Sequence, residues 1–188
     1  MTALARALGA DPAAVDEQTF RQALRRLPAG VAVITVGEGD ARTGLTATSA
    51  TSFSADPPSV LICVNRDASA APVIARERRF GLSVPSAGQA AVAERFSGKG
   101  GLKGASRYEG ASWRTLATGV LLLEGASAAL DCLVDDIVER HSHLIVIGRV
   151  VGALTANGGG ALVYRDGEYH RVEDFSRIFR LRRPFGFR

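Results

Sequence analysis

The sequence GLTATSATSFSADPPSVLICV (residues 44–64) decides how this chain folds. It begins with small residues and side-chain hydroxyls, passes through Pro57-Pro58, and ends in an apolar run typical of a buried β-strand. Hydroxyl groups donate and accept hydrogen bonds, and small side chains allow a planar ligand to lie close to the backbone. Threonine is also common in strands for structural reasons, and the pattern alone favours that simpler interpretation.

Short segments rich in β-branched residues recur on both sides of this stretch. Strands are predicted at 30–37, 43–53, 58–64 and 80–85, within 118–140 as a pair, over 143–155, and over 161–172 as a hairpin that turns at Asp166-Gly167. Short helices are expected after a capping box formed by Thr19 and Gln22, over 68–79, and over 87–96. About seven or eight strands without βαβ alternation predict a mainly β protein, an antiparallel barrel or sandwich.

The composition is that of an ordinary globular protein. The 188 residues are 46% hydrophobic and 22% charged, which fits one domain with a proper core. We expect an N-terminal extension over 1–17, the domain itself over 18–173, and a tail over 174–188 in which Phe and Arg alternate.

Charge and cysteine content exclude several classes of protein. The net charge of +4 comes mostly from Arg residues spread along the chain, and no nucleic-acid-binding module is recognisable. No apolar run approaches the roughly 18 to 20 residues that span a bilayer, and the N-terminus lacks a signal-peptide pattern. Cys63 and Cys132 are too few for a disulfide framework. These features predict a cytoplasmic protein without nucleic-acid or membrane partners.

The sequence contains only incomplete motifs for two common kinds of site, a phosphate-binding loop and a metal centre. The glycine-rich loop over 97–110 lacks the spacing of the common phosphate-binding motifs. His141 and His143 are two residues apart, so in a strand they would share one face, where Cys132, Glu139 or His170 could add a ligand. A metal centre needs three or four convergent ligands, and the sequence shows two clearly, so we expect no metal site. Cys63 and Cys132 sit in apolar strands and are interpreted as small buried residues.

Five segments, in order and at workable spacing, resemble one family. They are FRQALRRLPAGVAVITV (20–36), GLTATSATSFSADPPSVLICVNRDASA (44–70), RFGLSVPSAGQAAVAERFSG (79–98), HLIVIGRV (143–150) and ALVYRDGEYHRV (161–172). Together they resemble the flavin reductase family of the FMN-binding split-barrel type, which includes the reductase components of two-component flavin-dependent monooxygenases. The resemblance implies a homodimer of split antiparallel β-barrels, Greek-key-like with a few short helices, with flavin near the dimer interface.

The resemblance also implies where the flavin binds. By position in the family's motifs, the segment along the isoalloxazine ring corresponds to Thr46, Ala47, Thr48 and Ser49. The continuation of that segment corresponds to Ser52 and Ser54. The loop that receives the phosphate corresponds to Arg66, Ser69 and Ala70. Arg and Ser at the start of a helix also form a generic anion site, which agrees with the last assignment.

His143 is the residue that the resemblance connects to catalysis. It stands five residues before Gly148, as the family's His does before its Gly, on the nicotinamide side of the site. Many relatives place Asp before this His, where the present chain has Ser142. An imidazole there could bind the dinucleotide or steady charge on reduced flavin. A structural His at a strand end is the alternative.

The implied activity is reduction of FMN or FAD by NADH or NADPH, which supplies reduced flavin to a partner monooxygenase. The protein would contribute orientation and electrostatics, because hydride chemistry belongs to the cofactors. A flavin-binding electron carrier or sensor on the same barrel is the alternative. A metal-dependent enzyme that uses the His141 and His143 pair is a further one.

Overall fold

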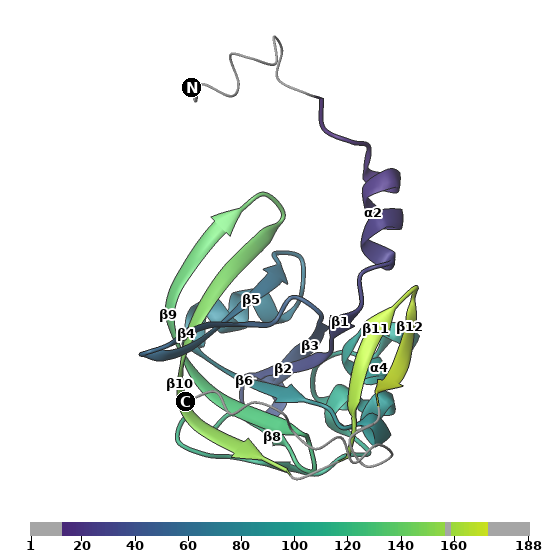
Figure 1. Cartoon of the computed structure of the whole chain (residues 1–188). Coiled ribbons are helices and arrows are strands. Elements are labelled where there is room, and N and C mark those ends of the chain that lie inside the picture. Colours follow the sequence, from purple (N-terminus) through teal and green to yellow (C-terminus); the bar gives the residue numbers. More distant parts are fainter. Residues whose placement is uncertain (1–12, 157–158, 173–188) are drawn as a thin grey trace, which may run out of the picture.

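The fold is known from a computed structural model that describes residues 13–156 and 159–172. Strands dominate it, and every strand pair is antiparallel, as the sequence predicts. The main sheet has seven strands, in the order β3 (Thr43–Ala47), β2 (Ala32–Val36), β6 (Arg79–Val84), β9 (Ala128–Arg140), β10 (His143–Thr155), β5 (Pro58–Asn65) and β4 (Thr51–Ala55). In Figure 1 this sheet curves around the centre of the molecule.

The hydroxyl-rich stretch supplies both ends of the main sheet. The single strand predicted over 43–53 is wrong, because the chain leaves β3 after Ala47 and starts β4 at Thr51. β3 and β4 are the first and last strands in the sheet order, and only residues 48–50 join them. A link of three residues spans at most about 14 Å, so the two ends of the sheet must lie close together. We call residues 48–50 the seam loop.

Two smaller sheets complete the β structure. One consists of β1 (Ala29–Gly30), β11 (Ala161–Arg165) and β12 (Glu168–Val172), and the other of β7 (Trp113–Arg114) and β8 (Leu122–Leu123). The predicted hairpin at Asp166-Gly167 is confirmed, with φ of 54° and 90° at its two turn residues. Positive φ at both positions is typical of a tight hairpin turn.

Within the described residues, three short α-helices accompany the sheets: α2 (Glu17–Arg25), α3 (Ala70–Glu77) and α4 (Ala90–Phe96). Single 3-10 turns lie at η1 (Gly39–Ala41), η2 (Ala87–Gln89), η3 (Lys99–Gly101) and η4 (Gly104–Tyr108). The predicted cap of the first helix is wrong. Asp16, not Thr19, caps α2, and its carboxylate accepts the Thr19 backbone N–H at 2.9 Å. None of the described helices has both the length and the apolar surface to cross a bilayer.

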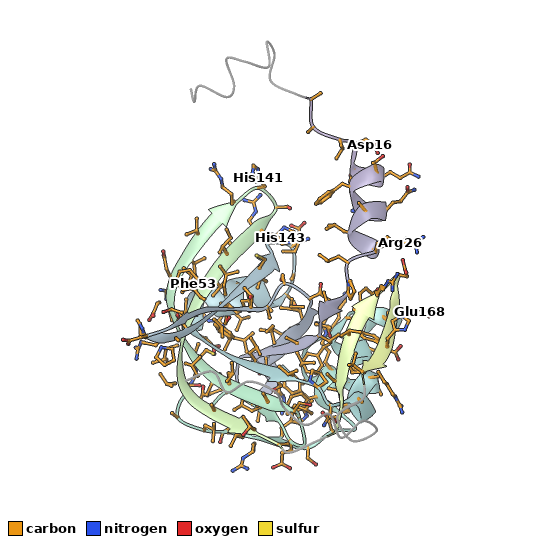
Figure 2. The ribbon with its side chains drawn as sticks, in the orientation of Figure 1. Asp16, Arg26, Phe53, His141, His143 and Glu168 are labelled. Carbon is orange, nitrogen blue, oxygen red and sulfur yellow. The ribbon has the colours of Figure 1, made fainter. Side chains whose placement is uncertain are left out.

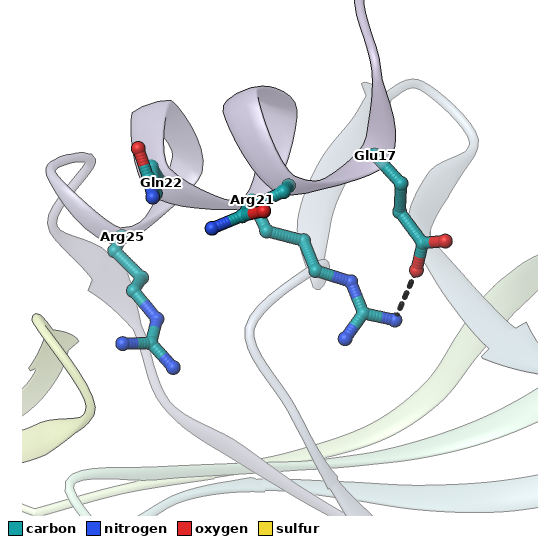
Figure 3. Close-up of a pocket in the computed structure, with 5 residues that line it drawn as sticks. Glu17, Arg21, Gln22 and Arg25 are labelled. Carbon is teal, nitrogen blue, oxygen red and sulfur yellow. Dashed lines mark ion pairs between the residues drawn. The ribbon is translucent and has the colours of Figure 1, made fainter.

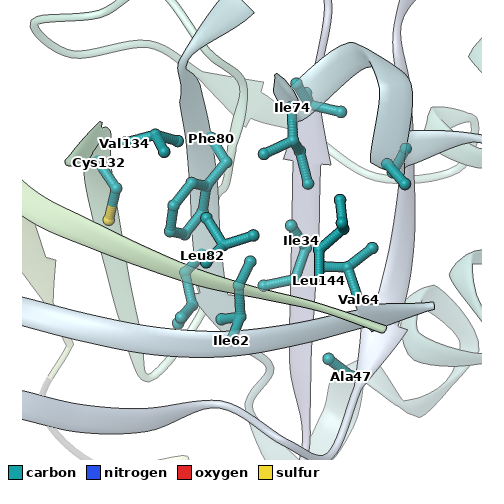
Figure 4. Packing of buried hydrophobic residues seen from close by; sticks show 14 of the residues in the cluster. Ile34, Ala47, Ile62, Val64, Ile74, Phe80, Leu82, Cys132, Val134 and Leu144 are labelled. Atoms are coloured by element: carbon teal, nitrogen blue, oxygen red, sulfur yellow. The ribbon is translucent and has the colours of Figure 1, made fainter. Parts of the chain in front are cut away.

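The core fills the inside of the curved main sheet (Figure 4). Its largest fully buried members include Ile34, Ile62, Ile74 and Phe80, which come from β2, β5, α3 and β6. Each such side chain contributes about 1.5–3 kcal/mol by leaving water. Cys132 is fully buried, as predicted, whereas Cys63 is only partly buried. Burial next to Asp131 raises the pKa of the Cys132 thiol to about 12.

Asp131 is a fully buried carboxylate in β9. It accepts the Thr118 backbone N–H at 2.8 Å and the Thr118 hydroxyl. We expect Asp131→Ala to lower the free energy of unfolding by about 1–3 kcal/mol, because two donors lose their partner. Urea denaturation checks this, with the exposed Asp136→Ala as the matched control. Equal midpoints for the two variants would contradict the assigned role of Asp131.

Candidate functional site

The seam loop presents exposed hydroxyls between the two ends of the main sheet. The Thr48 and Ser49 side chains are exposed. The Ser49 hydroxyl donates to the Cys63 carbonyl at 3.0 Å and accepts the Cys63 backbone N–H at 3.3 Å. Ser49 therefore ties the seam loop to the middle of β5 and fixes where the Thr48 side chain stands.

The other residues predicted to line the flavin ring, Thr46, Ala47 and Ser54, direct their side chains to different parts of the protein. The Thr46 hydroxyl donates to the Ala93 carbonyl at 2.6 Å, and the Ala47 side chain is buried. The Ser54 hydroxyl donates to the Asp56 carbonyl at 2.9 Å within its own turn. A ligand at these positions would meet backbone groups more than side chains.

Ser52 opens onto an apolar cavity of about 270 Å³ beside the seam loop. The walls come from several strands of the main sheet and from β1: Gly30, Val31, Ala32, Ala50, Thr51, Ser52, Val60, Leu82, Val84 and Leu130. Apolar walls with a few hydroxyls and backbone groups at the rim are typical of sites for flat heteroaromatic ligands.

The predicted phosphate loop follows the C-terminal end of β5. The Arg66 guanidinium is half-exposed and stands 3.8 Å from the Glu139 carboxylate. The Ser69 hydroxyl shares a hydrogen bond of 2.8 Å with Thr43, and Ala70 is fully buried. The backbone N–H groups of Asp67 and Ala68 donate to Asn65, so the Arg66 guanidinium and the backbone N–H groups of Ser69 and Ala70 are left to meet an anion.

His143 is the first residue of β10 and lies beside the phosphate loop. It is opposite Asn65 of β5, and the Arg66 backbone N–H donates to the Ser142 carbonyl at 3.0 Å. The His143 ring Nδ1 shares a hydrogen bond of 2.9 Å with the Ser142 hydroxyl. Ser142 thus orients the imidazole. Figure 2 shows His143 on the side of the molecule that faces α2.

Strand β5 connects these groups into one region. Cys63, which binds Ser49, pairs with Ile145, and Asn65, two residues further on, pairs with His143. Adjacent residues of a strand are about 3.3 Å apart, so the seam loop and His143 flank the same short piece of β5. The structure therefore brings together the seam loop, the Arg66 loop and His143, which are far apart in sequence.

The expected pairing of His141 with His143 on one strand face is wrong. His141 has a φ of 52° and lies in the turn between β9 and β10, so the alternation of a strand does not apply to it. In the described part of the chain, no three His, Cys, Asp or Glu residues are placed to hold a metal ion.

Sequence reasoning missed a basic cleft beside α2. It measures about 500 Å³ and is lined by Arg21, Leu24, Arg25, Leu27, Ala29, Thr48, Tyr164, Arg165 and Asp166. Figure 3 shows Arg21 and Arg25 side by side on α2, where they also line a neighbouring hollow of about 450 Å³. We call the first of these the α2 cleft. The spacing of Arg21 and Arg25 signals a shared helix face, but the hairpin that faces them is some 140 residues away in the chain.

Comparison with known proteins agrees with this geometry. Residues 24–173 match the flavin reductase-like domain. The chain is 35% identical over 156 residues to the FMN reductase (NADH) RutF 2 of Rhizobium rhizogenes strain K84, covering 83% of this chain and 89% of that protein.

Two solved structures extend the comparison. BorF, the flavin reductase component of a bacterial two-component tryptophan halogenase, superposes with a TM-score of 0.77 at 32% identity, over 85% of this chain and 99% of BorF. The NADH:FAD oxidoreductase SgcE6 of Streptomyces globisporus superposes with a TM-score of 0.75 at 30% identity, over 89% and 96% of the two chains. The chain therefore belongs to the flavin reductase-like domain family.

Proposed function

We propose that this protein reduces FMN or FAD with NADH or NADPH and supplies the reduced flavin to a partner monooxygenase. The observation that carries the proposal is the seam loop, whose hydroxyls flank the same piece of β5 as His143. Family membership supports it, because relatives are named FMN reductase (NADH) and NADH:FAD oxidoreductase. BorF, as a component of a two-component system, supports delivery of reduced flavin to a partner enzyme.

The described residues divide the work of binding and orientation. Bound flavin would supply the acceptor for a hydride from the reduced nicotinamide, which is chemistry of the two cofactors. The seam loop and Ser52 hold the ring edge through backbone groups and hydroxyls. Arg66 and the backbone N–H groups at the start of α3 neutralise the phosphate. His143, oriented by Ser142, would contact the nicotinamide side.

Flavin binding can be tested at Thr48, because its exposed side chain stands at the centre of the seam loop. Thr48→Leu should raise the flavin dissociation constant about tenfold or more, since a branched apolar group would replace a hydroxyl and obstruct the ring. Flavin fluorescence titration measures this. Thr155→Leu, at an exposed position on β10, is the matched control and should bind like the wild type. Unchanged affinity in a folded Thr48→Leu protein would remove this contact from the site.

The proposal includes a homodimer of split β-barrels. The close approach of β3 and β4 through the seam loop supports a barrel, and the family match over 24–173 supports one domain over 18–173. β4 is the last strand in the sheet order and presents Phe53, whose side chain is 56% exposed. An edge strand with an exposed aromatic side chain needs a cover.

Light scattering at micromolar concentration should give the mass of a dimer. Phe53→Asp should shift the mass toward that of the monomer, because it would bury a carboxylate in the interface. Val138→Asp, at another exposed apolar position, is the control. A monomeric wild-type protein would contradict the dimer proposal.

The proposed function includes a cytoplasmic location, since Cys63 and Cys132 are free thiols.

Steady-state kinetics test the activity itself. Purified protein should oxidise NADH or NADPH at a rate that depends on added free FMN or FAD. The alternative, a flavin-binding carrier or sensor, predicts tight flavin binding without such turnover. Binding without turnover under any combination of the four cofactors would favour that alternative.

A further inference from the structure

We propose that the α2 cleft binds the adenosine diphosphate group of a dinucleotide. This inference rests on the proposed function and adds a second subsite to it. Two dinucleotides of that reaction carry the same group, namely the reduced nicotinamide donor and FAD. The chemistry recognised is a pyrophosphate next to an adenosine, and the experiment below separates the two sources.

The charges in the cleft favour a doubly charged anion. Arg21 and Arg25 are one helical turn apart on α2, and Arg165 projects from the hairpin on the other side. Like charges at this spacing on a helix repel each other, and an anion between them relieves the repulsion. Arginine binds phosphate oxygens through two parallel N–H groups, which suits a pyrophosphate.

The carboxylates near the cleft cancel only part of this charge. Asp166 is already paired with Arg26 at 3.3 Å and with Arg165 at 3.4 Å. Glu17 pairs with Arg21 at 2.5 Å, but both side chains are about three-quarters exposed, so water screens that pair strongly. Arg25 forms no ion pair with any residue of the described chain. Its guanidinium is the cation most readily available to a ligand.

The remaining surface of the cleft fits the adenosine. Leu24, Leu27, Ala29 and Tyr164 provide apolar contacts between α2 and the hairpin. Leu24 is 48% exposed and Leu27 is 62% exposed, so both have surface left to cover. The volume of about 500 Å³ lies within the range of small-molecule sites.

Helix α2 has little packing of its own, so a ligand in the cleft would stabilise it. None of its residues is buried, and a helix of nine residues is marginal in water without packing. Two described contacts connect the end of α2 to the hairpin. The Asp166 backbone N–H donates to the Arg25 carbonyl at 2.8 Å, and the Arg26 guanidinium forms an ion pair with the Asp166 carboxylate. A ligand that bridges Arg25 and Arg165 would add a third connection.

The cleft is continuous with the proposed flavin site. Thr48 lines the cleft and belongs to the seam loop, whose next residue, Ser49, binds β5. A dinucleotide can therefore place its reactive ring beyond Thr48 and its adenosine diphosphate in the α2 cleft. A mononucleotide would occupy only the first of these places.

The test is a double variant, Arg25→Gln with Arg165→Gln, in the full chain. Asp166 keeps its pair with Arg26, and α2 contributes no buried residue, so the fold should survive. Arg114→Gln, an exposed arginine of β7 outside the cleft, is the matched control. Calorimetry with ADP alone measures binding to the cleft, and melting temperature reports the fold of each preparation.

Four further measurements identify the dinucleotide. They are the KM for NADH and for reduced nicotinamide mononucleotide, and the dissociation constants for FAD and for FMN. Loss of two charged contacts should weaken ADP about tenfold or more. If the double variant raises the KM for NADH by the same factor as it weakens ADP, and leaves the FAD dissociation constant unchanged, the cleft is assigned to the nicotinamide donor. If it raises the FAD dissociation constant by that factor and leaves the KM for NADH unchanged, the cleft is assigned to FAD.

Two outcomes overturn the inference. One is that wild-type protein and double variant bind ADP equally well or not at all. The other is that mononucleotides and dinucleotides weaken to the same extent. The proposed function fails separately, if the wild type oxidises neither NADH nor NADPH with any flavin. ADP binding can still be measured in that case, so the two failures are distinguishable.

Discussion

His143→Asn should lower kcat/KM for NADH by about ten- to a hundredfold and leave flavin affinity nearly unchanged. Losing one positioned polar contact costs about 1–3 kcal/mol, which corresponds to that range of rates. The effect is expected because the Ser142 hydroxyl holds the imidazole at the end of β10, next to the Arg66 loop. Flavin affinity should persist because the seam loop and Arg66 are unaltered.

His141→Asn is a matched control for this variant. His141 lies two residues away, in the turn, at a φ of 52° that Asn tolerates well. Melting temperature and NADH kinetics should be measured on the same preparations of both variants. A His143→Asn protein with a lower melting temperature and normal kinetics would show that His143 is structural.

Gly44→Val should destabilise the protein by about 3 kcal/mol or more. Gly44 lies in β3, just before the hydroxyl residues, and a Cβ there would overlap the Ile34 carbonyl oxygen. It would also lie 2.7 Å from the Phe96 ring, and both Ile34 and Phe96 are buried and unable to yield. The strand or the ring must therefore move.

Chemical denaturation measures this loss. Gly88→Ala is the control, because a Cβ there would meet no atom within 4 Å and its φ suits any residue. An unfolding midpoint for Gly44→Val equal to that of the wild type would refute the close packing of β3 against β2 and α4.

The sequence predicts the strands best where apolar residues are continuous. The strand predicted over 143–155 coincides with β10, and the hairpin over 161–172 with β11 and β12. Strand type and antiparallel pairing follow from local patterns of side chains. The break between β3 and β4 does not, because the hydroxyl residues continue through it without a change of pattern.

The site was harder to predict because its parts meet only in three dimensions. The resemblance named the seam residues, the Arg66 loop and His143, but the residues alone could not place them around β5. Asp135 and Asp136 lie within β9 at a register shift, where Asp135 faces Arg149 at 3.4 Å. The C-terminal tail over 174–188 lies outside the described residues.

Anaerobic mixing of the protein and NADH with excess FMN tests the central claim most directly. We predict that the visible absorbance of oxidised FMN disappears at a rate proportional to protein concentration, and that His143→Asn slows this step while His141→Asn does not. Bleaching that is no faster than without protein, for FMN and FAD and for NADH and NADPH alike, would contradict the account.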